Sequence, residues 1–200
     1  MNERSRPPAA GRPVRADAQR NRQALLDAAL RAFAQDGIDA SLDAIARTAG
    51  VGIGTLYRHF PTREALALAA YQHDVQRLCG SAGELLKTLP ADAALREWLA
   101  RFSEYIVTKR GMSAVLRSAL TDPQPFYAEL NVRERVLGAV TTLLDRGTAD
   151  RLLRTDISAD VVVLAMIGVW YVSAEPTTPD QLSRLLDLLV DGLRVRPPDR

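Results

Sequence analysis

The sequence predicts an all-α protein of about nine helices, in which a three-helix unit precedes a larger helical domain. Two observations carry this expectation. Apolar residues recur three and four positions apart along most of the chain, which is the spacing of one helical face. Glycine, proline or a capping hydroxyl separates these periodic segments, and no segment alternates apolar and polar residues as a half-buried strand would.

The N-terminal region begins with an arm and a long helix. Residues 1–16 are rich in proline, alanine and arginine without apolar periodicity, so we expect them to be disordered. A helix is predicted to begin near Asp17 and to end at Gly37, with Leu26 and Phe33 on its apolar face. Six arginines and two acidic residues in the first 22 positions make this end basic, which suits either a polyanion or a solubilising tail.

Two short helices joined by a glycine-containing turn follow. Ser41 can cap the first, which Gly50 ends, and the second occupies residues 52–60 before Pro61. Such a pair has the helix-turn-helix geometry of DNA-binding domains. The expected organisation is a disordered basic arm over 1–16, a helix-turn-helix domain over 17–62, and a larger helical domain over 63–195.

Bulk properties exclude several classes of protein. The single cysteine, Cys79, rules out an internal disulfide and fits a reducing, cytoplasmic setting. The N-terminus has no apolar stretch of the secretory type. The longest apolar run, 161–172, is well short of the ~20 residues that a bilayer span needs, so we expect no membrane segment.

The helices expected beyond residue 61 cover 62–78, 91–109, 112–120, 126–146, 158–173 (after Ser158) and 180–195 (capped by Asp180).

The outer face of the second short helix carries groups suited to DNA. Leu56 and Phe60 can anchor its inner side, which leaves Gly54 and Arg58 pointing outward. Polar side chains there can donate to phosphate oxygens, and Arg58 is suited to guanine. The alternative interpretation is an ordinary inter-helix turn with a half-buried Tyr57. The candidate DNA-binding residues are Ser41, Gly52, Ile53, Gly54, Thr55, Tyr57, Arg58, His59 and Arg63.

Residues 41–66 resemble the DNA-binding signature of the TetR family of repressors. The chain departs from that signature at Gly52, where many relatives carry serine or threonine, and at Arg63, which replaces a common lysine. Gly52 therefore supplies no capping hydroxyl, and the two departures leave the operator sequence unpredicted. The matching elements are Ile45-Ala46, Ala49-Gly50-Val51, Gly54-Thr55-Leu56-Tyr57, His59-Phe60 and Arg63-Glu64 followed by Leu66.

The resemblance implies a ligand-responsive homodimer. Its interface would be formed by the last two helices of each subunit, about 158–173 and 180–195, although both helices could instead be buried within one subunit. A two-fold dimer places two recognition helices about 34–36 Å apart, which predicts a near-palindromic operator in double-stranded DNA. A small molecule bound in the 63–195 domain would shift the helix over 62–78 and release the DNA.

Large apolar side chains of this second domain are candidates for lining an effector pocket, although most large apolar residues at helical spacing simply belong to a core. Charge is sparse near them, so we expect an apolar or aromatic effector. The candidates are Trp98, Phe102, Tyr105, Met112, Phe126, Tyr127, Met166 and Trp170.

No constellation of residues suggests catalysis or a cofactor. His59 and His73 lie 14 positions apart and, with Cys79, lack the spacing of metal ligands. No glycine-rich phosphate loop or nucleophile elbow occurs. We therefore expect a DNA-binding repressor with no enzymatic activity, no metal and no cofactor. The alternative is a helical interaction or scaffold protein that has the same fold but does not bind DNA.

Overall fold

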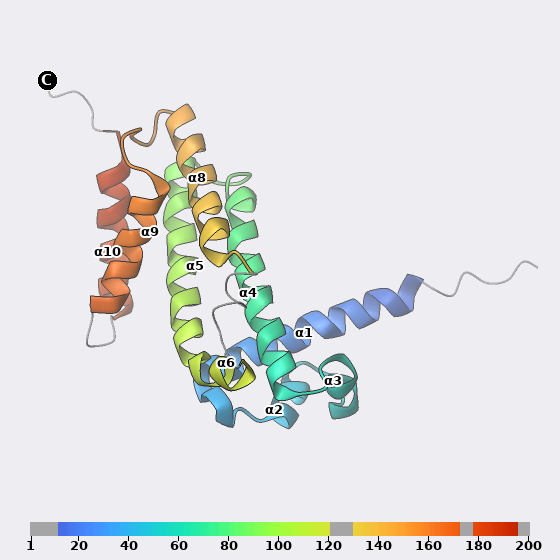
Figure 1. The fold of residues 1–200 in the computed structure, drawn as a ribbon. Coiled ribbons are helices and arrows are strands. Elements are labelled where there is room, and N and C mark those ends of the chain that lie inside the picture. The colour runs from blue at the N-terminus through green and yellow to red at the C-terminus, as the bar shows by residue number, and fades with distance from the viewer. Residues whose placement is uncertain (1–11, 121–129, 173–177, 196–200) are drawn as a thin grey trace, which may run out of the picture. The chain divides into compact units, whose positions relative to one another are not determined.

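The computed structural model describes residues 12–120, 130–172 and 178–195, which form nine α-helices and one short 3-10 helix (Figure 1). These described residues contain one isolated antiparallel bridge, between Leu153 and Arg194, and no longer strand, so the predicted all-α class is confirmed. None of the described helices has the length and apolar character that a membrane span requires. The elements are α1 (Arg12–Asp36), η1 (Gly37–Asp39), α2 (Leu42–Thr48), α3 (Ile53–His59), α4 (Arg63–Leu85), α5 (Ala91–Gly111), α6 (Ser113–Ala119), α8 (Val132–Ala149), α9 (Ala159–Val172) and α10 (Pro179–Leu193).

The chain divides into two compact units whose boundary differs from the predicted one between residues 62 and 63. Unit 1 contains residues 12–70 and 111–119, and unit 2 contains the other described residues. Unit 1 therefore includes the start of α4 and all of α6. Gly111 explains the second difference, because a Cβ there would overlap the backbone carbonyl of Ala34. Only glycine lets this segment approach the end of α1 so closely.

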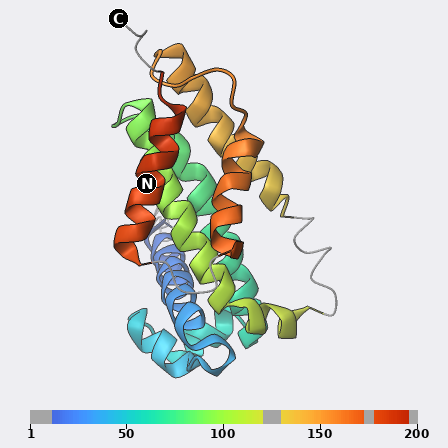
Figure 2. The ribbon, with the colours of Figure 1, turned by 90° about the vertical axis from the view of Figure 1, so that its left-hand side faces the viewer.

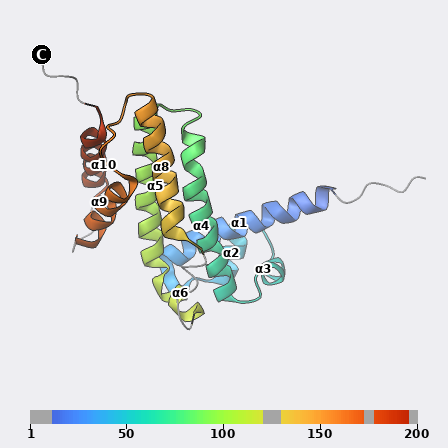
Figure 3. The same ribbon diagram turned by 45° about the horizontal axis from the view of Figure 1, so that its top comes forward.

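Unit 1 is built on the long helix α1, with the short helices α2 and α3 beside it (Figure 3). Its core contains Phe33 from α1 and Leu56 from α3, both fully buried. Helix α6 contributes the buried side chains of Val115 and Leu116 and packs against η1. The predicted apolar faces of the first three helices thus meet in one core.

Helix α1 begins at Arg12 rather than near Asp17, so residues 12–16 of the predicted disordered arm are helical. Pro13 lies in the first turn, where its missing N–H costs no helical hydrogen bond and its fixed φ favours the helix. The high proline and arginine content of residues 1–16 therefore led to a predicted helix start that is about five residues too late. Residues 1–11 of the arm lie outside the described residues.

In unit 2, α5 lies alongside α10 and the described part of α4 that follows Ala70 (Figures 1 and 2). Arg96 of α5 donates to the carboxylate of Asp187 at 2.9 Å and to the hydroxyl of Ser183 at 2.8 Å, both on α10. Trp98 on the same helix is fully buried, and its indole N–H donates to the carbonyl of Leu78 at 3.0 Å. Helix α8 packs against α9.

Two further elements of unit 2 begin where the sequence did not place them. Helix α8 begins at Val132 instead of residue 126, because Asn131 before it has a left-handed conformation with φ of 45°. Thr178, not Asp180, caps α10: its hydroxyl accepts from the N–H of Gln181, and the Gln181 side chain accepts from the N–H of Thr178. This reciprocal capping box fixes the start of the helix.

Candidate nucleic-acid interface and small-molecule cavity

The turn between α2 and α3 is tight and locally determined. The hydroxyl of Ser41 accepts a hydrogen bond from the N–H of Ala44 at 3.3 Å, which caps α2 as predicted. Gly50 has a φ of 71°, a left-handed conformation that glycine adopts without steric cost. The N–H of Val51 then donates to the carbonyl of Ala46 at 3.0 Å. Residues 49–52 therefore form a tight turn that joins the end of α2 directly to the start of α3.

Helix α3 is anchored by its inner side. Leu56 is fully buried and Phe60, directly after the helix, is nearly so. The guanidinium carbon of Arg22, on α1, lies 5.4 Å from the centroid of the Phe60 ring, in a cation–π contact. The sequence did not single out Arg22, although it lies four positions before Leu26 on the apolar face of α1. Hydrophobic burial and this contact together hold α3 against α1.

The opposite side of α3 faces solvent. Tyr57 is 49% exposed, Ile53 is 36% exposed, and Gly54 and Arg58 are also exposed. Arg58 lies along the helix, where it donates to the carbonyl of Gly54 and to the hydroxyl of Thr55, both at 3.3 Å. The outer face is thus small at its N-terminal end and aromatic and cationic further along.

Packing does not require glycine at Gly52, just before α3, or at Gly54 within it. A Cβ placed on Gly52 or Gly54 would meet no atom within 4 Å. Gly52, the N-cap residue, has a φ of −72° and supplies no capping side chain. Glycine within a helix costs roughly 0.5–1 kcal/mol relative to alanine, and Gly54 has this cost without a steric reason for glycine.

Two of the candidate DNA-binding side chains also support the local fold. Arg63, at the start of α4, donates to the carbonyl of Ala40 and so ties this helix to the residues before α2. His59 is half-buried, with its ring 6.2 Å from that of Phe60. Thr62 caps α4, since its hydroxyl accepts from the N–H of Ala65 at 3.0 Å.

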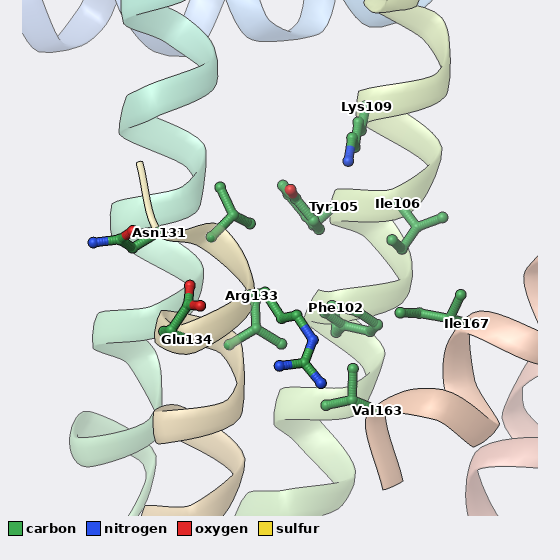
Figure 4. Close-up of a pocket in the computed structure, with 11 residues that line it drawn as sticks. Phe102, Tyr105, Ile106, Lys109, Asn131, Arg133, Glu134, Val163 and Ile167 are labelled. Atoms are coloured by element: carbon green, nitrogen blue, oxygen red, sulfur yellow. The ribbon is translucent and has the colours of Figure 1, made fainter. Parts of the chain in front are cut away.

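Unit 2 contains a cavity of about 510 Å³, which is partly open to solvent (Figure 4). Phe102 and Tyr105 line it, as the sequence suggested, and their part in binding a ligand stays a prediction. The volume falls in the range of roughly 300–1,000 Å³ that is usual for small-molecule sites. The lining residues are Phe102, Tyr105, Ile106, Lys109, Asn131, Val132, Arg133, Glu134, Val136, Val163 and Ile167.

The other predicted pocket residues lie elsewhere. Trp98, Met112 and Met166 are fully buried and do not line the cavity. Phe126 and Tyr127 lie outside the described residues. Trp170 belongs to α9, but its side chain is likewise outside the described part of the chain.

Two buried tyrosines, of which Tyr105 lines the cavity, join α4 to α5. The hydroxyls of Tyr71 and Tyr105 are 2.8 Å apart and share a hydrogen bond. Burial, reinforced by Tyr71, raises the pKa of Tyr105 far above its ordinary value, so its hydroxyl stays protonated. Burial also raises the pKa of Asp74, one turn further along α4, against the opposing effect of Arg77, whose guanidinium lies 3.0 Å from the carboxylate.

This tyrosine pair should behave as one energetic unit. Tyr71→Phe and Tyr105→Phe each remove the shared hydrogen bond and leave one buried hydroxyl without this partner, which should cost about 1–3 kcal/mol. The double variant should cost little more than either single one. Urea unfolding of the four proteins measures this coupling, and additive free-energy losses would mean that the two hydroxyls do not interact.

Helices α9 and α10 expose apolar side chains. Leu164 and Leu188 are each 70% exposed, and Val161 is 47% exposed. Leu193, the last residue of α10, is buried. The carbonyl of Leu193 accepts from the N–H of Arg154 at 2.8 Å, next to the bridge that joins Leu153 to Arg194, so the end of α10 is joined to residues 153–154.

Comparison with known proteins identifies both parts of the chain. A sequence model described as bacterial regulatory proteins, tetR family, matches residues 25–70, and one described as transcriptional regulator SbtR-like, C-terminal domain, matches residues 90–195. The HTH-type transcriptional repressor AcnR of Corynebacterium diphtheriae is 29% identical over 188 residues, which cover 88% of this chain and 93% of that protein.

Solved structures agree. The TetR transcriptional regulator SCO0520 of Streptomyces coelicolor is 44% identical, with a TM-score of 0.80 over 86% of this chain and 98% of that one. A TetR regulatory protein of Mycobacterium vanbaalenii is 29% identical, with a TM-score of 0.74 over 92% of this chain and 100% of that one. The chain belongs to the TetR family of transcriptional regulators, which are not enzymes.

Proposed function

We propose that this protein is a repressor that binds a near-palindromic operator as a homodimer and is released from it by a small molecule. The observation that carries the proposal is the solvent-facing side of α3, where an aromatic, a cationic and two glycine positions are exposed on a helix anchored from behind. A helix presented to the major groove needs this combination of a fixed inner side and an accessible outer side. The protein would act in the cytoplasm, on double-stranded DNA.

The outer face of α3 divides into contacts that position the domain and contacts that read bases. Tyr57 and Thr55 can donate to phosphate oxygens, which fixes the register without reading sequence. Arg58 can turn from its intrahelical hydrogen bonds to a guanine edge. Ser41, Gly52, Ile53, Gly54, His59 and Arg63 complete the proposed DNA-binding set.

The glycines support this assignment. Since neither Gly52 nor Gly54 is needed for packing, a requirement for close approach by an external group explains them better than the fold of unit 1 does. A bare backbone at the start of α3 lets N–H groups come near a phosphate. Arg63 would contribute chiefly by holding the start of α4 in place, through its hydrogen bond to Ala40.

The homodimer would bury the exposed faces of α9 and α10. Large apolar side chains such as Leu164 and Leu188 are seldom this exposed together on a soluble monomer. Two copies related by a two-fold axis would cover them and set two α3 helices about one DNA turn apart.

Leu188→Arg combined with Leu164→Arg should therefore dissociate the dimer. Placing charge at two central apolar positions should weaken association at least about thirtyfold, which corresponds to roughly 2 kcal/mol or more. Analytical ultracentrifugation over a range of concentrations measures the change. Val107→Arg is the matched control, since Val107 on α5 is 52% exposed and lies outside both helices. A double variant as dimeric as the wild type would contradict the proposed interface.

The effector site would be the cavity of unit 2, which can hold a molecule with an apolar or aromatic part. Helix α4 would transmit its presence, because Tyr71 on α4 is hydrogen bonded to Tyr105 in the cavity wall. A ligand that moves Tyr105 would change the position of α4 and lower the population of the DNA-binding state. Coupling of this kind typically amounts to ~1–3 kcal/mol.

Selection of sheared genomic DNA on the purified protein, followed by sequencing of the retained fragments, tests the proposal. We expect enrichment of one or a few near-palindromic sites, each with two half-sites about one DNA turn apart. The genes beside these sites would point to the effector through the chemistry of their products. No enrichment over input DNA at low salt would contradict the proposal and favour the helical interaction protein instead.

A further inference from the structure

Helix α1 continues beyond the core of unit 1 and carries a cation where it leaves that core. Figures 1 and 3 show α1 running past α3 toward its own N-terminus. Counted from residue 17, the first buried residues of α1 are Leu25 and Leu26, and Arg22, just before them, is exposed. Because positions four apart share a helical face, Arg22 continues the stripe of Leu26 onto the exposed part of the helix.

The side chain of Arg22 lies against the residue that follows α3. Its guanidinium carbon is 5.4 Å from the centroid of the Phe60 ring. Phe60 is nearly fully buried and comes directly after His59, the last residue of α3. The guanidinium group is therefore held beside the C-terminal end of α3, although it belongs to another helix.

This contact leaves the guanidinium group able to bind an anion. The aromatic ring is neutral, so the contact does not cancel the positive charge. A guanidinium group is planar, with its N–H donors along the edge, and it can stack on an aromatic face while it donates to a phosphate. Arg20, two positions earlier, differs in this respect, because its guanidinium group donates to the carboxylate of Asp17.

The position of Arg22 suits a phosphate close to those that α3 would contact. The ring centroid of His59, one of the proposed DNA-binding residues, is 6.2 Å from that of Phe60. Arg22 and His59 thus lie beside the same ring, and the two distances limit their separation to about 12 Å. Phosphates of one DNA strand follow each other every ~3.4 Å along the duplex axis. Two groups this close can reach phosphates only a few nucleotides apart.

We propose that Arg22 binds a phosphate of the operator from α1, outside the helix-turn-helix pair, while Phe60 fixes the position of its guanidinium group. The inference rests on the proposed function in one respect, namely that α3 enters the major groove. It adds α1 to the elements that contact DNA. It also assigns Arg22 to the contacts that position the domain, not to those that read bases.

The salt dependence of DNA binding by Arg22→Met tests the proposal, because it counts phosphate contacts. With the full-length protein and the operator recovered from genomic selection, the slope of log K against log[salt] should become shallower by about 0.9 for each protomer bound. At physiological salt the affinity should fall at least about tenfold, both for the operator and for an unrelated duplex of the same length. Arg22→Lys should keep the wild-type slope, since an ammonium group also neutralises a phosphate.

Arg31→Met is the matched control. Arg31 is also an exposed arginine of α1, but it lies nine positions after Arg22 and therefore on the opposite face of the helix. This variant should keep the wild-type slope. Circular dichroism should show that both methionine variants are folded, since both replaced side chains are exposed.

Two results would overturn the assignment of Arg22 while leaving DNA binding intact. One is an unchanged slope in Arg22→Met, even with reduced affinity, because a residue that only supports Phe60 does not change the number of phosphates bound. The other is the same change of slope in both methionine variants, which would reflect overall charge. A wild-type protein that bound neither duplex at low salt would instead contradict the proposed function, and the inference with it.

Discussion

Replacing Tyr57 with alanine should abolish operator binding while leaving the protein folded. Tyr57 is 49% exposed and fills no core position, so its truncation should change the free energy of unfolding by less than about 0.5 kcal/mol. In the proposed dimer each protomer would lose a DNA contact of roughly 1–3 kcal/mol, and the two losses combine at one operator. Fluorescence anisotropy with the operator recovered from genomic selection measures the affinity.

Two variants sharpen this experiment. Tyr57→Phe keeps the ring but removes the hydroxyl, so an intermediate loss would assign part of the effect to a phosphate contact. Leu89→Ala is the control, because Leu89 is also an exposed large side chain but lies outside unit 1. Full operator affinity in a folded Tyr57→Ala protein would show that the outer side of α3 is not the recognition face.

Replacing Trp98 with alanine should strongly destabilise the folded protein. The side chain is fully buried, stacks on Phe102 with ring centroids 5.5 Å apart, and donates to the carbonyl of Leu78. Truncation leaves a large cavity, which typically costs about 3–5 kcal/mol. For a chain of this size the Tm should fall by roughly 6–20 °C, which circular dichroism or calorimetry would measure.

The hydrogen bond is the smaller part of that loss. The carbonyl of Leu78 also accepts from the hydroxyl of Ser81 at 2.7 Å, so it is not orphaned when the indole is removed. Val107→Ala, an exposed change on the same helix, should alter stability by less than about 0.5 kcal/mol. If Trp98→Ala kept the wild-type Tm, Trp98 would not be a core residue and its role as a ligand contact would have to be reconsidered.

The inner side of the DNA-binding unit could be predicted from sequence because local rules determine it. Leu56 and Phe60 are buried as their spacing indicates, and Ser41 caps α2. Gly50 has the left-handed conformation that is typical of a glycine that ends a helix. Each of these features depends on residues only a few positions apart.

The cavity could not be predicted in the same way. Helical periodicity tells which side chains face inward, but a core position and a cavity position face inward alike. Met112 and Met166 have the pattern of Phe102, yet both are fully buried and do not line the cavity. Lys109 was not predicted to line the cavity. A lysine four positions after an aromatic residue has the same spacing as the polar edge of an ordinary amphipathic helix.

The unit boundary was also beyond local reasoning. The contact between Gly111 and Ala34 joins segments more than seventy positions apart, and the residues next to them in the sequence do not predict it. Only the absence of a side chain at Gly111 hints at a close approach, and a glycine at the end of a helix has a more common explanation as a stop signal.

The measurement that tests the central claim most directly is the salt dependence of binding to the selected DNA. Binding through phosphate contacts releases counterions, so log K should fall linearly with log[salt], with a slope of about −0.9 for each phosphate neutralised. With contacts from two protomers we expect a slope steeper than about −4 for the wild type. A slope near zero would contradict DNA binding through α3 and its neighbouring basic residues.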